Sequence, residues 1–204
     1  MQTPSTPWNK GRSVGPKAPL KHYQIWRIRR RLERDFARRD LALFSLALDS
    51  MLRASDLLAL RVGDVMDEAW HVRTALVIRQ RKTGYIAQVE LAPYTRAALE
   101  TWVAFSAKSA SDFLFTRRND DHGPPISAAQ YRKRVKAWVA SIGLNPDAYS
   151  THSLRRTLAA RVYHETKNIE VVRNLLGQSS VSSTSHYLNI GGTESLAVAR
   201  RYRI

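Results

Sequence analysis

Residues 41–60 read LALFSLALDSMLRASDLLAL, and this stretch decides the fold. From Leu41 to Leu52 the side chains are apolar nearly all round, a pattern typical of a helix buried on every side. Ser55 is a residue type that caps helix N-termini, so a second, short helix is expected from Asp56 to Leu60. The sequence thus predicts a central helix against which the rest of the protein packs.

Arg53 stands between these two predicted helices. A positive charge directly after a buried helix must reach solvent, a carboxylate or an anion, because burying it alone is costly. An ion pair with Asp56 or Asp64 is the structural alternative to a functional role. On this residue alone, both interpretations stay open.

Two runs rich in β-branched residues follow: TALVIRQ at 74–80 and YIAQVEL at 85–91. They flank the short connection Arg81-Lys82-Thr83-Gly84. A glycine in a short connection between such runs predicts a β-hairpin. Lys82 is expected at its tip or next to it.

Most other segments show the helical spacing of apolar residues and carry capping residues at their starts. Helices are expected from about His22, from Pro93 to about Phe105, from Ser127 to Gly143, from about Ser153 to Glu165, from Asn168 to Gly177, around Tyr187 and from Thr193 to Arg200. Phe113–Phe115 fits a short strand or a plug in the core. The predicted fold class is therefore α+β, mainly helical with one small hairpin. It forms one domain over residues 22–204, preceded by a basic, flexible arm over 1–21.

The composition narrows the classes of function. The 204 residues are 44% hydrophobic and 25% charged, which is typical of a globular protein. A net charge of +16 favours a polyanionic partner, and half of that excess lies in the first 40 residues. Because there is no cysteine, disulfide frameworks and cysteine-based metal sites are excluded. No segment is apolar enough to span a membrane, so we expect a soluble, cytosolic protein.

Two further stretches place charged and polar side chains at helix boundaries. The first is His152-Ser153-Leu154-Arg155-Arg156-Thr157, in which His152 and Arg155 share one face of a helix whose N-terminus favours an anion. The second is LLGQSSVSSTSHY at 175–187, which ends in Tyr187. Taken singly, a surface salt bridge explains the first stretch equally well, and a lone helical tyrosine usually belongs to the core or its rim.

Together, these stretches resemble the catalytic boxes of the tyrosine recombinases, also called phage integrases. The family's first box, G-L-R-x-S-E-L-x-x-L, matches MLRASDLLAL at 51–60, and its second, H-x-L-R-H/R-T, matches HSLRRT at 152–157. Its third, L-L-G-H-x-S-x-x-T-T-x-x-Y, matches residues 175–187, and its hairpin lysine matches Lys82. Each box is weak alone, but four in the right order over residues 22–200 are a strong signal. Because only the arm precedes this region, the chain resembles minimal, catalytic-domain-only members such as the fimbrial-type inversion recombinases.

The resemblance implies a site-specific DNA recombinase in which Tyr187 attacks a scissile phosphate and forms a 3′-phosphotyrosyl link. Arg53 and Arg155 would hold the nonbridging oxygens, because a planar guanidinium matches phosphate bidentately. Lys82 would protonate the leaving 5′ oxygen, and His152 would act as general base or hydrogen-bond partner. The energy of the broken bond is kept in the phosphotyrosine, so no cofactor and no metal are implied.

Gln178 departs from the family pattern, which usually has His or Trp at this position. A glutamine donates a hydrogen bond to a phosphate oxygen but carries neither a proton nor a charge. We therefore expect Gln178 to position the phosphate, with slower chemistry. The neighbouring His186 is a poor substitute, because adjacent residues on a helix diverge by about 100° from Tyr187's direction.

Double-stranded DNA is the implied partner, bound by a homo-tetramer that exchanges a C-terminal helix, with residues 193–204 as its candidate; an accessory DNA-bending protein is a further expected partner. Basic side chains of the arm, the first helix, the hairpin and two later helices are the candidate DNA contacts: Lys10, Arg12, Lys17, Arg27, Arg30, Arg31, Arg34, Arg81, Arg132, Lys133, Lys136 and Arg156. Integration, excision and inversion all stay open as outcomes. The alternatives are a catalytically weak or dead DNA-binding regulator on the same fold, and a type IB topoisomerase-like enzyme. A generic RNA-binding domain would explain the charge but not the ordered boxes.

Overall fold

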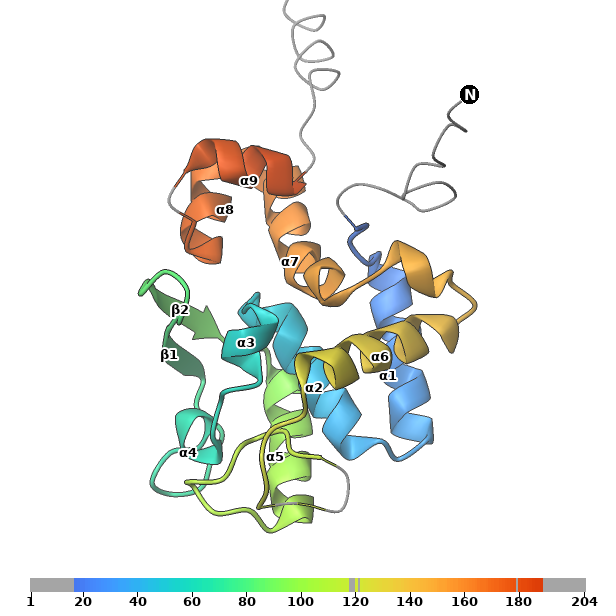
Figure 1. Cartoon of the computed structure of the whole chain (residues 1–204), viewed down its shortest axis with the longest axis vertical. Helices are drawn as coiled ribbons and strands as arrows, with labels where there is room; N and C mark the ends of the chain where they lie inside the picture. Colours follow the sequence, from blue (N-terminus) through green and yellow to red (C-terminus); the bar gives the residue numbers. More distant parts are fainter. Residues whose placement is uncertain (1–16, 118–119, 121, 179, 189–204) are drawn as a thin grey trace, which may run out of the picture.

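The computed structural model describes residues 17–117, 120, 122–178 and 180–188. These residues form helices and one hairpin in the order α1 (His22–Arg34), α2 (Arg38–Ser50), α3 (Ala54–Leu57), α4 (Val62–Val65), β1 (Ala75–Arg79), β2 (Ile86–Glu90), α5 (Pro93–Ser106), α6 (Ala128–Ala140), η1 (Pro146–Ala148), α7 (Thr151–Thr166), α8 (Ile169–Leu176) and α9 (Val181–Leu188). Figure 1 shows a helical body from which α7 leads to the α8–α9 pair, with the hairpin beside α3. The predicted α+β class, mainly helical with one hairpin, is confirmed.

The α2 helix forms the centre of the main core. Residues 42–48 are all buried, and α2 packs against α1, α5 and α7. The Trp138 ring of α6 meets the Phe44 ring edge-on, with centroids 5.5 Å apart. The middle of the helix is buried all round because its side chains there are apolar nearly all round, so the prediction of a central helix is confirmed.

The boundary around Arg53 differs from the prediction. The α2 helix ends at Ser50 rather than at Leu52, because Met51 adopts the left-handed conformation with φ of 48°. Arg53, not Ser55, is the N-cap residue of α3. A non-glycine residue with positive φ costs about 1 kcal/mol, and no sequence signal announces it. The burial of the Met51 side chain, which is 5% exposed, offsets that cost.

The hairpin follows the prediction. Its antiparallel strands pair from Ala75 opposite Glu90 to Arg79 opposite Ile86. The turn closes with a hydrogen bond from the backbone N–H of Gly84 to the carbonyl of Gln80, at 2.8 Å, and Gly84 has a φ of +68°. A positive φ is natural for glycine, which explains why this residue ends the turn. Lys82 lies in the exposed turn, as expected.

Two other predictions can be judged, and a third cannot. Ser127 and Gln130 form the predicted capping box of α6. Leu114 and Phe115 are fully buried outside any strand, so the 113–115 segment is a plug in the core. The predicted helix from Thr193 lies outside the described residues.

The last residues of the predicted arm are packed rather than free. The Leu20 side chain is 6% exposed and belongs to the main core. Its backbone N–H donates to Thr157 Oγ1 at 3.0 Å. Residues 17–21 therefore anchor to α7, and the flexible-arm prediction concerns residues 1–16, which lie outside the described residues.

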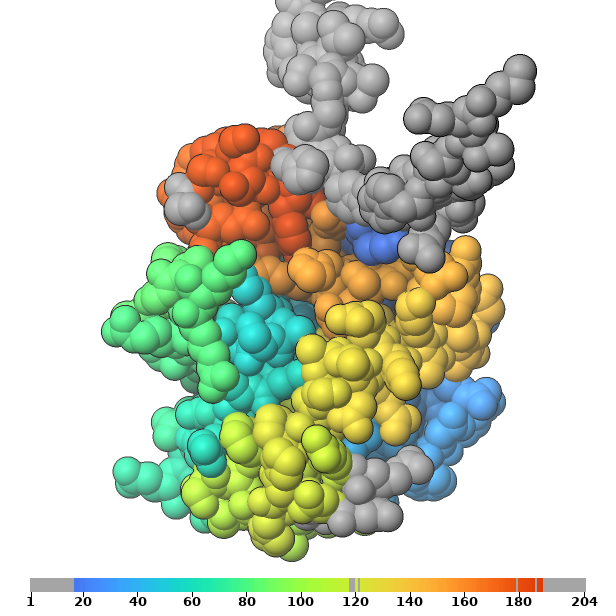
Figure 2. Space-filling view, in the orientation of Figure 1, coloured from blue at the N-terminus to red at the C-terminus, as the bar shows by residue number. Residues whose placement is uncertain are grey.

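The α8–α9 pair has an apolar cluster of its own. Met51, Ala159, Val172 and Leu176 form it, and the Tyr187 side chain packs against it. In the space-filling view the pair stands as a separate lobe above the body and next to the hairpin (Figure 2). Because Tyr187 belongs to α9, this cluster places the tyrosine over the N-terminal half of α7.

Candidate active site

The N-terminal turns of α7 carry the second predicted box. Ser150 caps the helix, accepting a hydrogen bond from the His152 N–H at 3.2 Å. Arg155, one turn later, is 4% exposed. Its Nη2 donates to the carbonyl of Leu176 at 2.8 Å, and its guanidinium interacts with the Tyr187 hydroxyl. Its buried Nη1 makes no hydrogen bond of ordinary geometry among the described residues. A buried cation with an unused donor is the kind of group that binds an anion.

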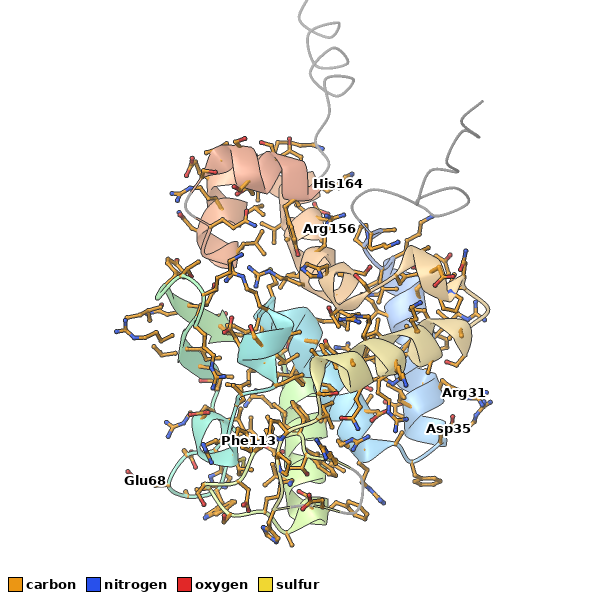
Figure 3. The ribbon with its side chains drawn as sticks, in the orientation of Figure 1. Arg31, Asp35, Glu68, Phe113, Arg156 and His164 are labelled. Carbon is orange, nitrogen blue, oxygen red and sulfur yellow. The ribbon has the colours of Figure 1, made fainter. Side chains whose placement is uncertain are left out.

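Tyr187 comes to this end of α7 from α9. Its hydroxyl donates to the backbone carbonyl of His152, at 3.5 Å. The guanidinium of Arg156 lies over its ring, 4.8 Å from the centroid. Figure 3 shows Arg156 projecting from α7 beneath α9. The tyrosine is thus held between two helices, with its hydroxyl beside the predicted catalytic residues.

Burial shifts the pKa values of the two titratable site residues, Tyr187 and His152, in opposite directions. Burial raises the pKa of Tyr187 above its usual 10, and the positive charges of Arg155 and Arg156 oppose that rise. Burial also lowers the pKa of His152 below 6.5, and Arg155, Arg156 and Arg53 lower it further. At neutral pH the phenol therefore keeps its proton and the imidazole is neutral, which leaves the imidazole able to accept a proton.

Arg53 reaches the same site from the start of α3. Its Nη1 donates to the side-chain oxygen of Gln80, and its charge acts on both Arg155 and His152. The alternative of an ion pair is wrong for the described residues. Asp56 instead accepts from the backbone N–H of Arg81 at 3.0 Å, and Asp64 accepts from that of Arg61 at 2.7 Å.

Gln178 lies between α8 and α9, beside this cluster. Its side-chain oxygen accepts a hydrogen bond from the Thr184 hydroxyl at 2.7 Å. That bond orients the amide so that its NH₂ group is the end left to donate. The arrangement agrees with the positioning role that the sequence predicts for Gln178.

Lys82 is placed by the hairpin turn and not by contacts of its own. It makes no hydrogen bond or ion pair with any other residue in the described part of the chain, and its neighbours 81–84 are exposed. The turn itself is held through the Asp56 bond to Arg81 and through Gln80. The structure thus brings Arg53, His152, Arg155 and Tyr187 together. The Gln178 side chain contacts Thr184 of α9, and Lys82 lies in the exposed hairpin turn.

The predicted DNA contacts differ in their exposure and in their partners. Lys10 and Arg12 lie outside the described residues. Arg27, Arg81, Arg132 and Lys133 are exposed, whereas Arg30, Arg31, Arg34 and Lys136 share their charge with Glu33, Asp35 and Asp147. Lys17 is partly buried, and its Nζ donates to the Asp147 carbonyl at 2.8 Å.

Arg156 differs from the surface contact that the sequence predicts. It is 6% exposed, its Nη1 donates to the carbonyl of Lys17 at 2.6 Å, and its guanidinium stacks on Tyr187. Held in this way, the Arg156 side chain packs on the Tyr187 ring and is not exposed at the surface. The reason is the packing of α9 over α7, which the sequence does not reveal.

Sequence reasoning missed two polar residues of the site, Gln80 and Thr184. Both are buried, at 1% and 0% exposure. For Gln80 a signal existed: it follows Leu76 and Ile78 at the alternate, inward positions of the strand, where a polar side chain is unusual. Thr184 sits within the third box and carries no comparable signal.

Within the described residues, no group of three or more His, Asp or Glu side chains is arranged to hold a metal ion. Among the same residues, no helix has the length and apolar character that crossing a membrane requires.

The chain is similar in sequence to known proteins of one family. The model of the Phage integrase family matches residues 19–192. Tyrosine recombinase XerC of Neisseria gonorrhoeae is 36% identical over 155 residues, which cover 74% of this chain and 47% of XerC. Probable integrase/recombinase YoeC of Bacillus subtilis is 31% identical over 157 residues, which cover 75% of this chain and 78% of YoeC. The chain thus spans about half the length of the XerC relatives that it matches.

Solved structures share the fold. The crystal structure of XerA recombinase superposes with a TM-score of 0.72 at 18% identity, covering 94% of this chain and 66% of XerA. XerH site-specific recombinase, in its pre-cleavage complex with difH substrate, gives 0.70 at 16% identity, covering 93% of this chain and 56% of XerH. Taken together with the match to the family model over residues 19–192, these findings show that the chain belongs to the phage integrase family, the family of the tyrosine recombinases.

Proposed function

We propose that this protein is a site-specific DNA recombinase that cleaves and rejoins DNA through Tyr187. One observation carries the proposal. The buried guanidinium of Arg155 interacts with the Tyr187 hydroxyl and keeps an Nη1 group without a geometrically formed hydrogen bond, and Arg53 and His152 are close neighbours. A receptor for an anion next to a nucleophile fits a phosphodiester as substrate.

The proposed step is a displacement at phosphorus. The Tyr187 oxygen forms a bond to the scissile phosphorus while the bond from phosphorus to the 5′ oxygen breaks, which leaves a 3′-phosphotyrosyl link and a 5′-hydroxyl. His152, neutral at physiological pH, takes the phenol proton, and Lys82 gives a proton to the 5′ oxygen. Rejoining reverses the step with a 5′-hydroxyl from another strand.

The arginines provide the electrostatic part of catalysis. Negative charge grows on the nonbridging oxygens in the transition state, and Arg53 and Arg155 lie where fixed positive charge stabilises it. Gln178 adds a neutral donor. Burial raises the pKa of Tyr187 and the arginine charges oppose that rise, so the phenol gives up its proton to the base as it attacks and not before.

Further parts of the proposal concern partners. We infer a homo-tetramer on DNA in which residues 193–204 pass to a neighbouring subunit, an accessory DNA-bending protein, and a cytoplasmic location beside the nucleoid. The exposed cations Arg27, Arg132 and Lys133, with residues 1–16, would contact the DNA backbone. Sedimentation of the DNA complex tests the tetramer: removal of residues 193–204 should dissociate it, and an unchanged tetramer would contradict helix exchange.

The decisive experiment captures the covalent intermediate. Random-sequence duplexes, each with a nick that lets the released 5′-hydroxyl fragment diffuse away, are incubated with the protein, and denaturation-resistant adducts are recovered and sequenced. Wild type should yield adducts that share one DNA sequence, and Tyr187→Phe should yield none. Absence of any adduct would favour a DNA-binding regulator.

Relaxation of a supercoiled plasmid that lacks the recovered sequence separates the recombinase from a type IB topoisomerase. A recombinase should leave that plasmid supercoiled. Efficient relaxation would instead favour the topoisomerase.

A further inference from the structure

Gln80 is a buried polar residue in a position that apolar residues normally occupy. It follows the end of β1, with the inward parity of Leu76 and Ile78, and is 1% exposed. Burying an amide without hydrogen-bond partners is costly, so a buried glutamine is expected to use both ends of its side chain.

Both ends of the Gln80 amide are used, and each faces a different part of the site. Its oxygen accepts from Arg53 Nη1 and, at 3.4 Å, from the hydroxyl of Thr83 in the hairpin turn. Its nitrogen donates to the carbonyl of Leu176 at 3.4 Å. The same carbonyl accepts from Arg155 Nη2 at 2.8 Å. One side chain therefore links both arginines and the turn that carries the predicted general acid.

The C-terminus of α8 is fitted closely against this amide. A Cβ atom on Gly177 would lie 2.9 Å from Gln80 Nε2 and 2.3 Å from Tyr85 Cδ1, so only glycine fits there. The Tyr85 hydroxyl donates to the carbonyl of Asn174 at 3.0 Å. The hairpin and the end of α8 are thus fixed to each other on both sides of Gln80.

We propose that Gln80 is a positioning residue for DNA cleavage. It orients the guanidinium of Arg53 toward the scissile phosphate and holds it in a fixed position relative to Arg155. This inference rests on the proposed function. The choice of an amide has a physical reason: its oxygen orients the guanidinium without cancelling its charge. A carboxylate in the same place would form an ion pair with Arg53 and compete with the phosphate for it.

Two substitutions distinguish the hydrogen bonds of the Gln80 amide from its lack of charge. Gln80→Leu removes both hydrogen-bonding ends at similar size. Gln80→Glu keeps an acceptor for Arg53 but adds charge and removes the donor to the Leu176 carbonyl. Gln88→Leu is the matched control, because Gln88 is an exposed glutamine on the facing strand β2. The melting temperature of each variant shows whether it folds.

The assay compares two versions of the recovered target duplex in the suicide format, one with an ordinary scissile phosphodiester and one with a neutral methylphosphonate there. A neutral centre has less need of a correctly aimed cation. Gln80→Leu should lose about 10–100-fold in adduct formation on the phosphodiester, the scale of a misplaced catalytic group, and much less on the methylphosphonate. Arg53→Ala should show the same selectivity, Gln80→Glu should also lose phosphodiester cleavage, and Gln88→Leu should match wild type.

The outcomes are distinguishable from a failure of the proposed function. If wild type forms no adduct on any duplex, the proposed function fails. If wild type forms an adduct, an equal loss by Gln80→Leu on both substrates indicates a merely structural role and overturns the inference. Wild-type cleavage by either Gln80→Leu or Gln80→Glu overturns it as well.

Discussion

Arg155 should lower the stability of the folded protein. It is 4% exposed, its Nη1 makes no hydrogen bond of ordinary geometry among the described residues, and burial lowers its pKa, with the nearby Arg53 charge lowering it further. Asp56 and Tyr187 compensate only in part. The substitution Arg155→Met, with a side chain of similar length and no charge, should therefore stabilise the folded state while it removes cleavage.

The size of the effect follows from these contacts. Replacing buried charged groups by apolar residues, as measured for whole ion pairs, is neutral or stabilising by about 1–4 kcal/mol. The Leu176 carbonyl loses its shorter hydrogen bond, which costs about 1 kcal/mol, but keeps the bond from Gln80. The expected net gain is thus roughly 0–3 kcal/mol, or up to roughly 10 °C in melting temperature for a chain of this length. Cleavage should fall by about 10²–10³-fold, the scale of one lost oxyanion donor.

Thermal unfolding followed by circular dichroism, with the suicide-substrate assay beside it, tests both halves. Arg161→Met is the matched control, because Arg161 lies exposed on the same helix and its loss should change neither quantity. Sulfate should raise the melting temperature of wild type more than that of Arg155→Met, since only wild type has the complete anion receptor. A melting temperature for Arg155→Met clearly below that of wild type would refute the reasoning.

Three further predictions concern the site and its surroundings. In the folded protein the pKa of His152 lies below its ordinary 6.5, so between the two values the unfolded chain binds more protons than the folded one. Stability should therefore fall as pH drops through 6.5, and it should fall less in His152→Asn. Melting temperatures measured across this pH range test the prediction. Deletion of residues 1–16 should weaken DNA binding with the melting temperature kept, whereas deletion of 1–20 should also lower the melting temperature, because Leu20 is buried; equal melting would contradict the anchor. Gln178→His should keep or raise the cleavage rate in the adduct assay, and a large loss would show that Gln178 does more than position the phosphate.

Much of this fold could be predicted because local patterns and final packing agree. The 41–48 stretch, apolar except for Ser45, became the core of α2, and the β-branched runs around Gly84 became the hairpin. The end of α2 could not be predicted, because Met51 takes a conformation that its type disfavours and is stabilised by packing against α7 and α8. Such long-range compensation leaves no local signal in the sequence.

The candidate site divides in the same way. The types of Arg53, His152, Arg155 and Tyr187 at box positions sufficed to predict their convergence, because each sits at the end of a recognisable element. The depth of Arg156 could not be predicted, since its surroundings are set by α9 and by residues 17–20, which are distant in sequence. The periodicity of apolar residues shows on which face of its own helix or strand a residue lies. It does not show which other element packs over that face.

The separate apolar cluster beneath α8 and α9 has a consequence for when the nucleophile is available. Among the described residues, the apolar contacts that hold this pair to α7 are fewer than those of the main core, so its opening should cost a fraction of the free energy that unfolds the body. The backbone amide protons of α9 should accordingly exchange with solvent faster than those of α2 in the same molecule. Tyr187 then belongs to a local equilibrium between docked and undocked forms, and a bound molecule needs only a modest preference for one of them to set its population.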